Sequence, residues 1–565
     1  MVSKRVVDYI VDQLVAQGVT HLFGVDGANI EDLYAAAQFG AVTVVLAKHE
    51  FGAATMADGF SRATSTLGVV AATSGGGSLN LVAGLGESFA SRTAVLALVG
   101  QPPSAMDGRG SFQDTSGVNG SLNAQALFAS VSVYCRRVLS AADVVSVLPD
   151  AIAAALSGGP AVLLLPKDVQ QSLIDVSPPG TIEPVRRVDS PRAIVELMER
   201  RRGPVTIIAG EQVARDDARI ELRNLQRAVN AVVATVPDAK DAAAEAGLVT
   251  GVMGHPGVER AIAASAMCLL VGTRLPVTAR AGLDDVLRRV PVASIGSAVP
   301  HVESMHVHSD DLRVSLAQLT EPVAKGGRPN RDRLLHDALS PPRHHGPGIR
   351  YRDAMTAIDA ALPDDADVVV DAGNSGAAAI HHLRARPSGR FLVALGMGGM
   401  GYSFGAAIGM CFARRRRTVV IAGDGSFFMH GMELHTAIQY GLPLTVVLFN
   451  NNAHAMCVTR EQLFYDDPRS LRSCPPGDDR YSYNRFTKSR PGAGLAAMFP
   501  GLSSVDVTSA GALPGALRDA LGHAGPSVVS IECSADEIPP FAPFLAAVDH
   551  LSRHQEMNQD VAART

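Results

Sequence analysis

The stretch that decides the fold is residues 419–457, VVIAGDGSFFMHGMELHTAIQYGLPLTVVLFNNNAHAMC. Its first residues, 419–422, form a short, β-branched apolar run, which predicts a buried strand. Residues 427–440 have helical spacing and end just before a glycine and a proline. A second apolar run, 444–449, predicts another buried strand. The stretch therefore predicts a βαβ unit, in which the carboxyl ends of two parallel strands meet at one edge of a sheet.

Polar residues follow both strands and suit a divalent cation beside a diphosphate. The carboxylate of Asp424 and the side-chain oxygen of Asn451, with a nearby backbone carbonyl, are ligands that Mg²⁺ accepts. Gly425 allows a ligand to approach the backbone closely, and the amides that open the next helix favour an anion. The alternative is an ordinary strand-turn-helix with a polar turn. The residues assigned to this clamp are Asp424, Asn451 and Ala453 for the metal, and Gly423, Gly425, Ser426 and Asn451 for the cofactor.

Length and composition predict a large cytoplasmic protein of several domains. At 565 residues the chain is long enough for three or four domains, and a hydrophobic content of 47% supports a large core. The net charge of −5 gives no electrostatic case for binding nucleic acid. No apolar run is long enough to span a membrane, and the N-terminal segment does not look like a signal peptide. The six cysteines are scattered without a CxxC pair, which predicts reduced thiols.

Repeated strand-turn-helix patterns predict an α/β protein with three doubly wound domains, each built on a parallel sheet covered on both faces. The first domain is expected at residues 1–178 and a central α/β domain at 190–325. A linker rich in proline, glycine and arginine is expected at 326–348. The third domain is expected at 349–540, followed by a loosely held polar tail at 541–565.

The first domain has candidate side chains at the ends of its predicted strands. Glu50 follows the apolar run at 42–47 and starts a helix rich in glycine and alanine. Gly27 ends an earlier strand, and Ser74 and Asn80 bound a glycine-rich turn. The alternative for Glu50 is an acid in the first turn of a helix, where the helix dipole favours negative charge.

These motifs resemble, over nearly the whole chain, those of thiamine diphosphate (ThDP) enzymes. GDG followed by a hydrophobic strand and NN is similar to the signature of that family. Residues 48–64, KHEFGAATMADGFSRAT, resemble the segment that carries the cofactor-activating glutamate. Residues 395–409, LGMGGMGYSFGAAIG, are similar to the stretch that holds the bent cofactor in acetolactate synthases. The resemblance thus implies a member of the acetolactate synthase branch of the pyruvate oxidase/decarboxylase superfamily.

The resemblance also implies roles for individual residues. Glu50 would bond the pyrimidine N1′ and promote the imino tautomer, so that the cofactor removes its own thiazolium C2 proton. The carbonyl of Gly398 would accept from the 4′-amino group, and Met400 would wedge between the two rings, although plain core filling is the alternative for a methionine. The first domain would bind the pyrimidine and the third the diphosphate. The implied cofactor contacts are Gly27, Glu50, Ser74, Asn80, Gly398, Met400, Gly423, Gly425, Ser426, Asn451, His454 and Met456.

In this family, Glu50 and the diphosphate site come from different subunits, which implies a homodimer or homotetramer. The site would then form at a subunit interface.

The reaction type is inferred from the segments that distinguish the branches. Pyruvate decarboxylases carry an Asp after the first glycine turn and a His-His pair near residue 110. Here Ala28 follows the turn, and residues 107–116 contain no histidine. Phe112 and Gln113 instead resemble the acetolactate synthase residues that flank the reacting carbonyls. The resemblance therefore favours a carboligase.

Two departures from the acetolactate synthase pattern bear on substrate and cofactor. Arg460 stands where biosynthetic enzymes have a Trp that selects the acceptor. Its guanidinium could bind a carboxylate or phosphate, and a solvent-facing arginine is the alternative. Residues 272–276, GTRLP, replace the Arg-Phe-Asp-Asp run of FAD-binding members. We therefore expect ThDP and Mg²⁺ as cofactors and do not expect FAD.

The expected function is a ThDP- and Mg²⁺-dependent carboligase that decarboxylates a 2-oxo acid such as pyruvate and transfers the acyl anion equivalent to an acceptor carbonyl. Its catalytic residues would be Glu50, Phe112, Gln113 and Arg460, and its partners small molecules and further copies of the chain. A simple 2-oxo acid decarboxylase or 2-hydroxyacyl lyase is the main alternative, and a non-enzymatic subunit with a vestigial site is a third.

Overall fold

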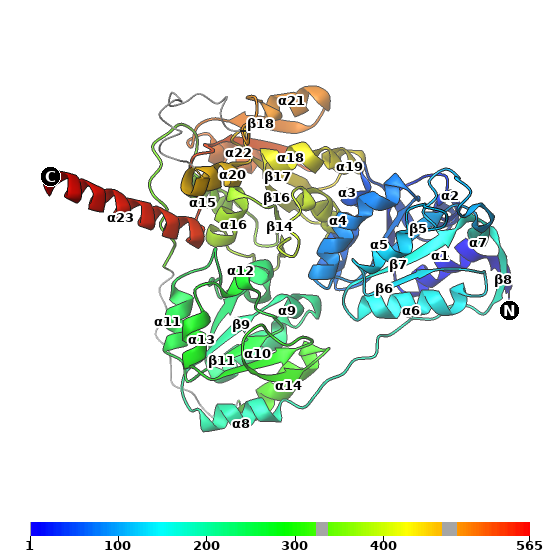
Figure 1. Cartoon of the computed structure of the whole chain (residues 1–565), viewed down its shortest axis with the longest axis horizontal. Helices are drawn as coiled ribbons and strands as arrows, with labels where there is room; N and C mark the ends of the chain where they lie inside the picture. Colours follow the sequence, from blue (N-terminus) through cyan, green and yellow to red (C-terminus); the bar gives the residue numbers. More distant parts are fainter. Residues whose placement is uncertain (1, 324–336, 466–482, 565) are drawn as a thin grey trace. The chain divides into compact units, whose positions relative to one another are not determined.

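The structure is a computed structural model that describes residues 2–323, 337–465 and 483–564. The chain divides into two compact units, each with its own core (Figure 1). The first comprises Met1–Arg187, Ala394–Thr418 and His430–Leu444, and the second comprises Val188–Val393, Val419–Met429 and Thr445–Thr565. Among the described residues, none of the helices combines the length and the apolar character needed to cross a membrane.

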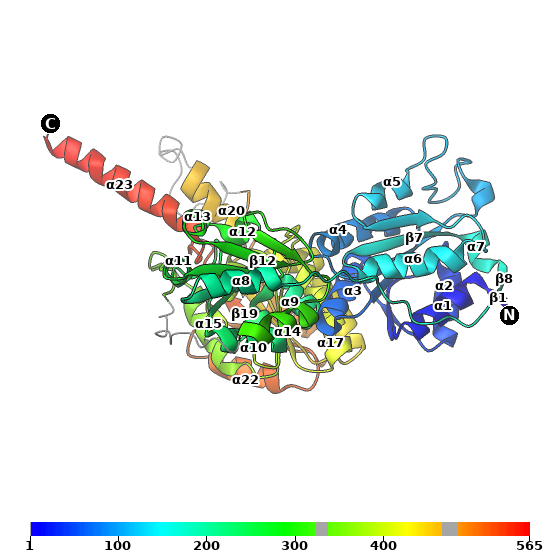
Figure 2. The ribbon, with the colours of Figure 1, turned by 90° about the horizontal axis from the view of Figure 1, so that it is seen from below.

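The first unit contains a six-stranded parallel sheet in the order β3-β2-β4-β5-β7-β6. Alternate residues of its strands, such as Leu96 and Leu98, form one core with α1, α2 and α6, while α3 and α4 pack against the sheet from the other side (Figure 2). A short antiparallel pair joins β1 to β8. The strands are β1 (Val2–Arg5), β2 (His21–Val25), β3 (Thr43–Leu46), β4 (Gly68–Ala72), β5 (Val95–Gln101), β6 (Tyr134–Arg137), β7 (Pro160–Pro166) and β8 (Leu173–Val176), and the helices are α1 (Val6–Ala16), α2 (Glu31–Phe39), α3 (Glu50–Thr64), α4 (Gly76–Ala90), α5 (Ala124–Ala129), α6 (Val144–Leu156) and α7 (Lys167–Gln171).

Helix α3 is buried along almost its whole length because α17 (Tyr402–Arg414) packs closely against it within the first unit. A Cβ atom on Gly405 would lie 2.0 Å from Thr55 Oγ1, and one on Gly409 would lie 2.0 Å from the Met56 carbonyl oxygen. Glycine is therefore required at both positions by the approach of the two backbones.

The second unit contains a five-stranded parallel sheet in the order β10-β9-β11-β12-β13. Helices α8, α10 and α14 pack together, and α11 and α13 form a second group (Figures 1 and 2). The elements of this sheet are β9 (Val205–Ala209), β10 (Val232–Thr235), β11 (Met267–Val271), β12 (Val292–Gly296), β13 (Met305–His308), α8 (Arg192–Arg200), α9 (Glu211–Arg215), α10 (Arg219–Val229), the 3-10 helix η2 (Pro237–Ala243), α11 (Gly257–Ala263), α12 (Val277–Arg280), α13 (Asp284–Arg289) and α14 (Leu312–Val323).

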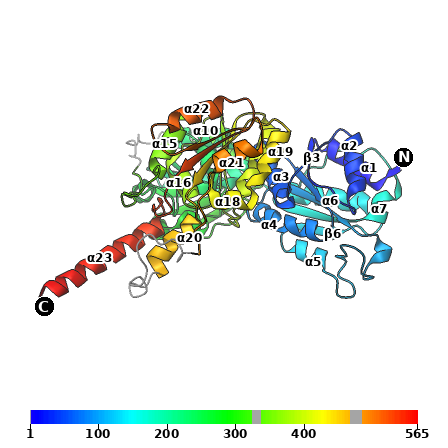
Figure 3. The ribbon, with the colours of Figure 1, turned by 90° about the horizontal axis from the view of Figure 1, so that it is seen from above.

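A third sheet, of six strands in the order β15-β14-β16-β17-β19-β18, carries the motif from which the fold was predicted. It is parallel, like the other two, so that the expected three parallel-sheet α/β domains are confirmed. Helices α15 and α22 lie side by side beside it (Figures 1 and 3). Its elements are β14 (Asp367–Val370), β15 (Phe391–Val393), β16 (Thr418–Gly423), β17 (Leu444–Asn450), β18 (Ser503–Val507), β19 (Ser527–Glu532), α15 (Tyr351–Ala361), α16 (Asn374–His382), α18 (Asp424–His430), α19 (Leu434–Gln439), α20 (Ala455–Arg460), α21 (Pro491–Met498), α22 (Leu513–Gly522) and α23 (Ala542–Arg564).

The two strands predicted at 419–422 and 444–449 are present as β16 and β17. The prediction of a single helix at 427–440 is wrong. It is divided into α18 and α19 by the 3-10 turn Gly431–Glu433. The division has a tertiary cause, since the carboxylate of Glu433 is buried and accepts hydrogen bonds from the Lys48 backbone N–H and the Thr436 hydroxyl. Residues 542–564, expected to be a loosely held tail, form α23.

Candidate cofactor site

Glu50 is the first residue of α3, directly after β3 and the N-cap residue His49. It is 9% exposed, and its Oε2 atom accepts a 2.9 Å hydrogen bond from Asn80 Nδ2. The first turn of α4 lies so close that a Cβ on Gly77 would be 2.9 Å from Glu50 Oε1. The sheet edge thus holds a buried carboxylate beside the glycine-rich turn at the start of α4. Glu50 also lies in the first turn of a helix, so this location is consistent with both interpretations of the residue.

Three further predicted residues of the first unit gather around Thr73. The hydroxyl of Thr73 lies 3.3 Å from Gln113 Oε1, and a Cβ on Gly27 would be 2.8 Å from the Cβ of Thr73. The neighbouring Ser74 is fully buried, and its hydroxyl accepts a 2.7 Å hydrogen bond from Asn29 Nδ2. Sequence reasoning missed Thr73 and Asn29, although Thr73 directly precedes the glycine-rich turn that it had selected. Phe112, in contrast, is 77% exposed.

The loop that carries Gly398 and Met400 also belongs to the first unit. Glu87 of α4 fixes its beginning by accepting hydrogen bonds from the backbone N–H groups of Gly396 (3.2 Å) and Met397 (2.7 Å). Gly398 has a φ of 65°, which favours glycine, and Met400 is half-buried. The position of a Cβ on Gly399 is 3.7 Å from the ring of Phe51, so the loop lies beside the start of α3.

A buried polar network ties α17 to α3 next to this loop. Asp58 is fully buried and accepts hydrogen bonds from the Tyr402 hydroxyl and, at 2.7 Å, from the Ser88 hydroxyl. Arg62 Nε forms an ion pair with Asp58 at 2.7 Å. Burial raises the pKa of Tyr402 well above its usual value, which keeps its hydroxyl a donor. The network connects the helix of Glu50 to the helix that follows Met400.

Asp424 lies in the second unit at the carboxyl end of β16 and is fully buried. One carboxylate oxygen accepts a 3.0 Å hydrogen bond from the Gly425 N–H, and the other accepts from the Asn452 N–H. Burial raises the pKa of Asp424 to about 7, although these backbone bonds oppose the shift. Within the described part of the chain, Asp424 forms no salt bridge. Because a buried carboxylate without a counter-ion is unstable, its surroundings fit a cation.

Asn451 directly follows the neighbouring strand β17, on the same edge as Asp424. Its side-chain oxygen accepts a 3.1 Å hydrogen bond from the Ala453 N–H, and its Nδ2 atom donates to the Tyr351 hydroxyl at 3.4 Å. The described residues contain no cluster of three or more His, Cys, Asp or Glu side chains suited to a metal. A cation on this edge would therefore be held by one carboxylate, one amide and backbone or ligand oxygens, a donor set that Mg²⁺ accepts.

The start of α16 lies on the same edge and was missed by sequence reasoning. Gly373 has a φ of 108° before the helix, and Ser375 Oγ is 3.8 Å from the position of a Cβ on Gly423. Asn374 is 3% exposed, and its side-chain oxygen has no hydrogen-bond partner in the part of the chain that the structure describes. Ser426 points to this segment, since its hydroxyl donates to Asp371 at 2.6 Å. The signal was present in the sequence as DAGNSG, a glycine-bearing turn after the strand at 367–370.

The segment after β17 carries the remaining predicted residues. The Nδ1 atom of His454 is buried and has no hydrogen-bond partner within the described ranges of the chain. Its ring meets that of Phe486 edge-on, with 4.7 Å between the ring centres. Met456 is half-buried on α20. Arg460 is exposed at the end of α20, with its guanidinium 5.9 Å from the centre of the Phe464 ring. Exposure in a single chain is consistent with both interpretations of Arg460.

The predicted residues thus form two groups. The first group belongs to the first unit and consists of Gly27, Glu50, Ser74, Asn80, Phe112, Gln113, Gly398 and Met400, of which Phe112 is exposed. The second group belongs to the second unit and consists of Gly423, Asp424, Gly425, Ser426, Asn451, Ala453, His454, Met456 and Arg460. Carboxylates, glycine turns and helix starts at the carboxyl ends of parallel strands define the class: an α/β protein that binds a phosphorylated cofactor.

Comparisons with known proteins identify the family. Residues 4–120, 192–309 and 371–531 match the N-terminal TPP binding domain, the central domain and the C-terminal TPP binding domain of thiamine pyrophosphate enzymes. This chain belongs to the thiamine pyrophosphate enzyme family. It is therefore a ThDP-dependent enzyme that forms or breaks carbon–carbon bonds.

Similar proteins agree with this family over nearly the full length. The acetolactate synthase isozyme 2 large subunit of Escherichia coli is 28% identical over 95% of this chain and 96% of its own. The acetolactate synthase of Arthrospira platensis is 27% identical over 94% of both chains. An X-ray structure of a candidate thiamin diphosphate-dependent enzyme from Mycobacterium smegmatis has a TM-score of 0.76 at 22% identity, covering 94% of this chain and 100% of that one, which shows a shared fold.

Proposed function

We propose that this enzyme is an acetolactate synthase-like carboligase that requires Mg²⁺ together with ThDP. It decarboxylates a 2-oxo acid such as pyruvate and joins the acyl equivalent to an acceptor carbonyl. The observation that carries the proposal is the buried Asp424, which lacks a counter-ion among the described residues and shares its edge with Asn451 and the start of α16. The acetolactate synthases among its similar proteins support the choice of reaction.

In this proposal each group of residues has a separate task. Asp424, the Asn451 side chain and the Ala453 carbonyl hold Mg²⁺, and Gly423, Gly425 and Ser426 contact the diphosphate. Gly27, Ser74, Asn80, His454 and Met456 line the rest of the cofactor site. When bound, ThDP supplies the carbanion chemistry on which every reaction of the family depends.

The acid of the site is Glu50. Its carboxyl group would bond to the pyrimidine N1′ of the bound cofactor, and Asn80 orients that carboxyl group through the 2.9 Å hydrogen bond to Oε2. The Gly398 carbonyl and Met400 fix the conformation of the cofactor. Phe112 and Gln113 lie beside the reacting carbonyls, and Arg460 binds the carboxylate or phosphate of the acceptor.

A simple decarboxylase or 2-hydroxyacyl lyase is the second candidate, and His454 is the observation that favours it. Its buried Nδ1 atom has no hydrogen-bond partner among the residues that the structure describes, so that it is available to pass a proton to or from a ligand. Protonation in place of carboligation would release an aldehyde.

Product analysis separates the two candidates. The purified enzyme is incubated with ThDP, Mg²⁺ and pyruvate, first alone and then with a panel of aldehydes and 2-oxo acids. We expect an acyloin or an acetohydroxy acid. Aldehyde as the sole product with every acceptor would reject the carboligase and support the second candidate.

We further propose that the enzyme works without FAD. The strand-end turns of the middle sheet are occupied by the side chain of Gln212, which is 3% exposed. It donates to the Ser309 carbonyl at 2.9 Å and accepts from the Ser297 N–H at 2.8 Å. Strand ends of this kind are where open α/β sheets bind nucleotides. The absorbance spectrum of the purified protein tests the proposal, since flavin bands would contradict it.

A further inference from the structure

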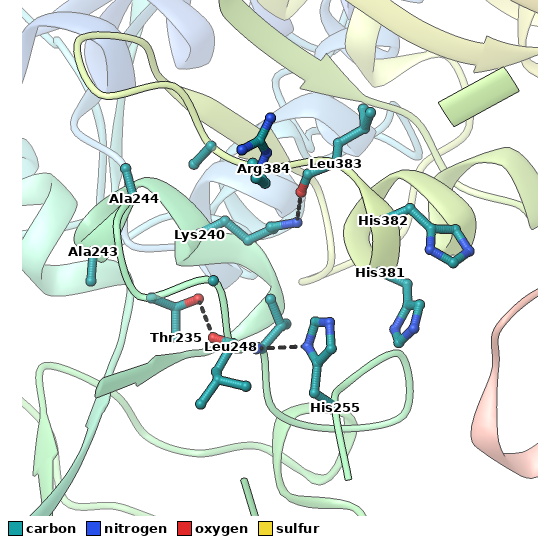
Figure 4. A pocket seen from close by; sticks show the side chains of 13 residues that line it. Thr235, Lys240, Ala243, Ala244, Leu248, His255, His381, His382, Leu383 and Arg384 are labelled. Atoms are coloured by element: carbon teal, nitrogen blue, oxygen red, sulfur yellow. Dashed lines mark hydrogen bonds between the residues drawn. The ribbon is translucent and has the colours of Figure 1, made fainter. Parts of the chain in front are cut away.

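Lys240 is a buried lysine in the second unit that has no role in the proposed chemistry. It lies in η2, beside a cavity of about 220 Å³ between the middle sheet and the end of α16 (Figure 4). Its side chain reaches across to Leu383, while His255, His381 and His382 stand on another side of the cavity. Only 7% of Lys240 is exposed.

Two backbone carbonyls and one aromatic ring lie close to the Lys240 amine. It donates to the Ile380 carbonyl at 2.6 Å and to the Leu383 carbonyl, and it lies 4.7 Å from the centre of the Phe391 ring. In the described part of the chain Lys240 forms no salt bridge. Burial lowers the pKa of Lys240 to about 7, and the negative charge of Asp359 opposes this shift. Because two of its donors bond to backbone carbonyls of the same chain, we take Lys240 to serve the protein itself and not a ligand in the cavity.

The acceptors of Lys240 are the carbonyls of Ile380, in the last turn of α16, and of Leu383, the residue directly after the helix. The final carbonyls of a helix have no partner within the helix and carry the negative end of its dipole, so a cation satisfies both needs. His381, in the last turn, makes a second attachment. Its Nδ1 lies 2.9 Å from the Met253 carbonyl oxygen, and its Nε2 accepts from the Leu339 N–H at 3.0 Å. The carboxyl end of α16 is thus fixed by the middle-sheet part of the second unit.

The amino end of the same helix belongs to the cofactor edge. Asn374 and Ser375 begin α16, with Ser375 Oγ 3.8 Å from the position of a Cβ on Gly423. Asn374 Nδ2 donates to Thr459 Oγ1 at 3.2 Å, which connects it to α20. The helix has nine residues, so its two ends are only about 12 Å apart. A displacement or fraying of one end is therefore transmitted to the other.

We propose that Lys240 is a positioning residue that fixes α16 and thereby holds Asn374 and Ser375 in place at the cofactor edge. The proposal rests on the proposed function, because that edge is where ThDP and Mg²⁺ would bind. If Lys240 has this role, the part of the chain built on the five-stranded sheet contributes to cofactor affinity without binding a ligand itself.

The test replaces the lysine without leaving a large void. Lys240→Met keeps the length of the side chain and removes the charge and all three donors. The control is Lys4→Met, at a partly exposed lysine of the first unit that pairs with Asp12. Two readouts are compared with the unchanged enzyme: hydrogen exchange of the peptide spanning 374–385, and the Kd of ThDP measured by calorimetry at saturating Mg²⁺.

We expect Lys240→Met to speed exchange in α16 and to raise the Kd of ThDP about tenfold, as the loss of hydrogen bonds to a charged group would. At saturating ThDP, kcat should change less than threefold, because the lysine touches no reacting atom. The Lys4→Met control should match the unchanged enzyme in both readouts. Unaltered exchange and an unaltered Kd in a folded Lys240→Met variant would overturn the proposal.

If Lys240→Met does not fold, the same two readouts are measured on a second variant, Phe391→Leu. It keeps the lysine and both carbonyl bonds and removes only the ring, so we expect smaller changes in the same direction, about threefold in Kd. No change in either readout would overturn the proposal. If the unchanged enzyme itself fails to bind ThDP at this edge, the proposed function fails, while the exchange of α16 still shows whether Lys240 holds the helix.

Discussion

Asp424 combines full burial, two backbone hydrogen bonds and a pKa raised to about 7 in the absence of a metal. Asp424→Ala removes the carboxylate that we assign to Mg²⁺. We expect the Mg²⁺-dependent affinity for ThDP to fall about 100-fold or more, since a metal ligand is lost outright. Calorimetry with and without Mg²⁺ measures the effect, and Asp353→Ala, at an exposed acid of α15, is the control. Unchanged affinity would refute the metal assignment.

Glu50 lies in the first turn of a helix. Besides the proposed role as the cofactor-activating acid, its negative charge there could serve only a favourable interaction with the helix dipole. Glu50→Gln keeps an acceptor for Asn80 but cannot hold a proton. We expect ThDP to remain bound while turnover falls about 100- to 10,000-fold, the range for loss of an acid–base group. Asp8→Asn, at a first-turn acid of α1, is the matched control and should leave turnover unchanged. Near-normal turnover of Glu50→Gln would favour the dipole interpretation.

At the scale of elements, α3 and α17 pack through glycines and share the buried Asp58. Tyr402→Phe removes one donor to Asp58 and adds no bulk. We expect a loss of about 1–3 kcal/mol in the free energy of unfolding, because a buried carboxylate loses a hydrogen bond. Denaturant unfolding followed by circular dichroism measures the loss. Tyr440→Phe, at a partly buried tyrosine of the same unit, is the control and should cost less.

The two histidines at the end of α16 should make the free energy of unfolding depend on pH. Burial lowers the pKa of His381 to about 4. The hydrogen bond to the Met253 carbonyl opposes this shift, and the charges of Lys240 and Arg352 make smaller contributions that add to it. The pKa of His382 is lowered to about 4 by burial, His381, Arg352 and Lys240. The unfolded chain, with ordinary values near 6.5, binds more protons between pH 6.5 and 4, so stability falls as the pH drops through that window. Thermal unfolding at pH 7, 5.5 and 4.5 should show the fall, and His381→Asn should flatten it. An equally steep fall in that variant would contradict the assignment to His381.

Sequence patterns predicted the strands but not the contacts that modify the elements between them. The run at 444–449 is β-branched, apolar and flanked by turn residues, so its strand follows from local information. The break in the helix at 427–440 depends on Glu433 bonding to Lys48, nearly 400 positions away in the chain. Asp424 and Glu50, in contrast, could be selected as candidate site residues from local sequence, because each follows a predicted strand within a recognisable motif. Asn374 was missed because its importance arises from β14 lying next to β16.

At the scale of the whole molecule, the first unit holds the acid and the second holds the candidate metal ligands. A ThDP site requires both groups, and the resemblance to acetolactate synthases implies that they come from different copies of the chain. We therefore propose a homodimer or homotetramer in which each site combines Glu50 of one copy with Asp424 of another. Sedimentation of the purified enzyme should then give a mass of two or four chains.

Mixing two inactive variants tests whether the site is shared between copies. Glu50→Gln and Asp424→Ala are each expected to be inactive alone. After subunit exchange, half of the dimers contain one copy of each variant. If sites are shared, one of the two sites in such a dimer has both mutations and the other has neither, so about a quarter of the normal activity returns. If each chain forms its own site, every site carries one mutation and no activity returns. Exchange must be verified with differently tagged copies, because lack of recovery after confirmed exchange would rule out the shared site.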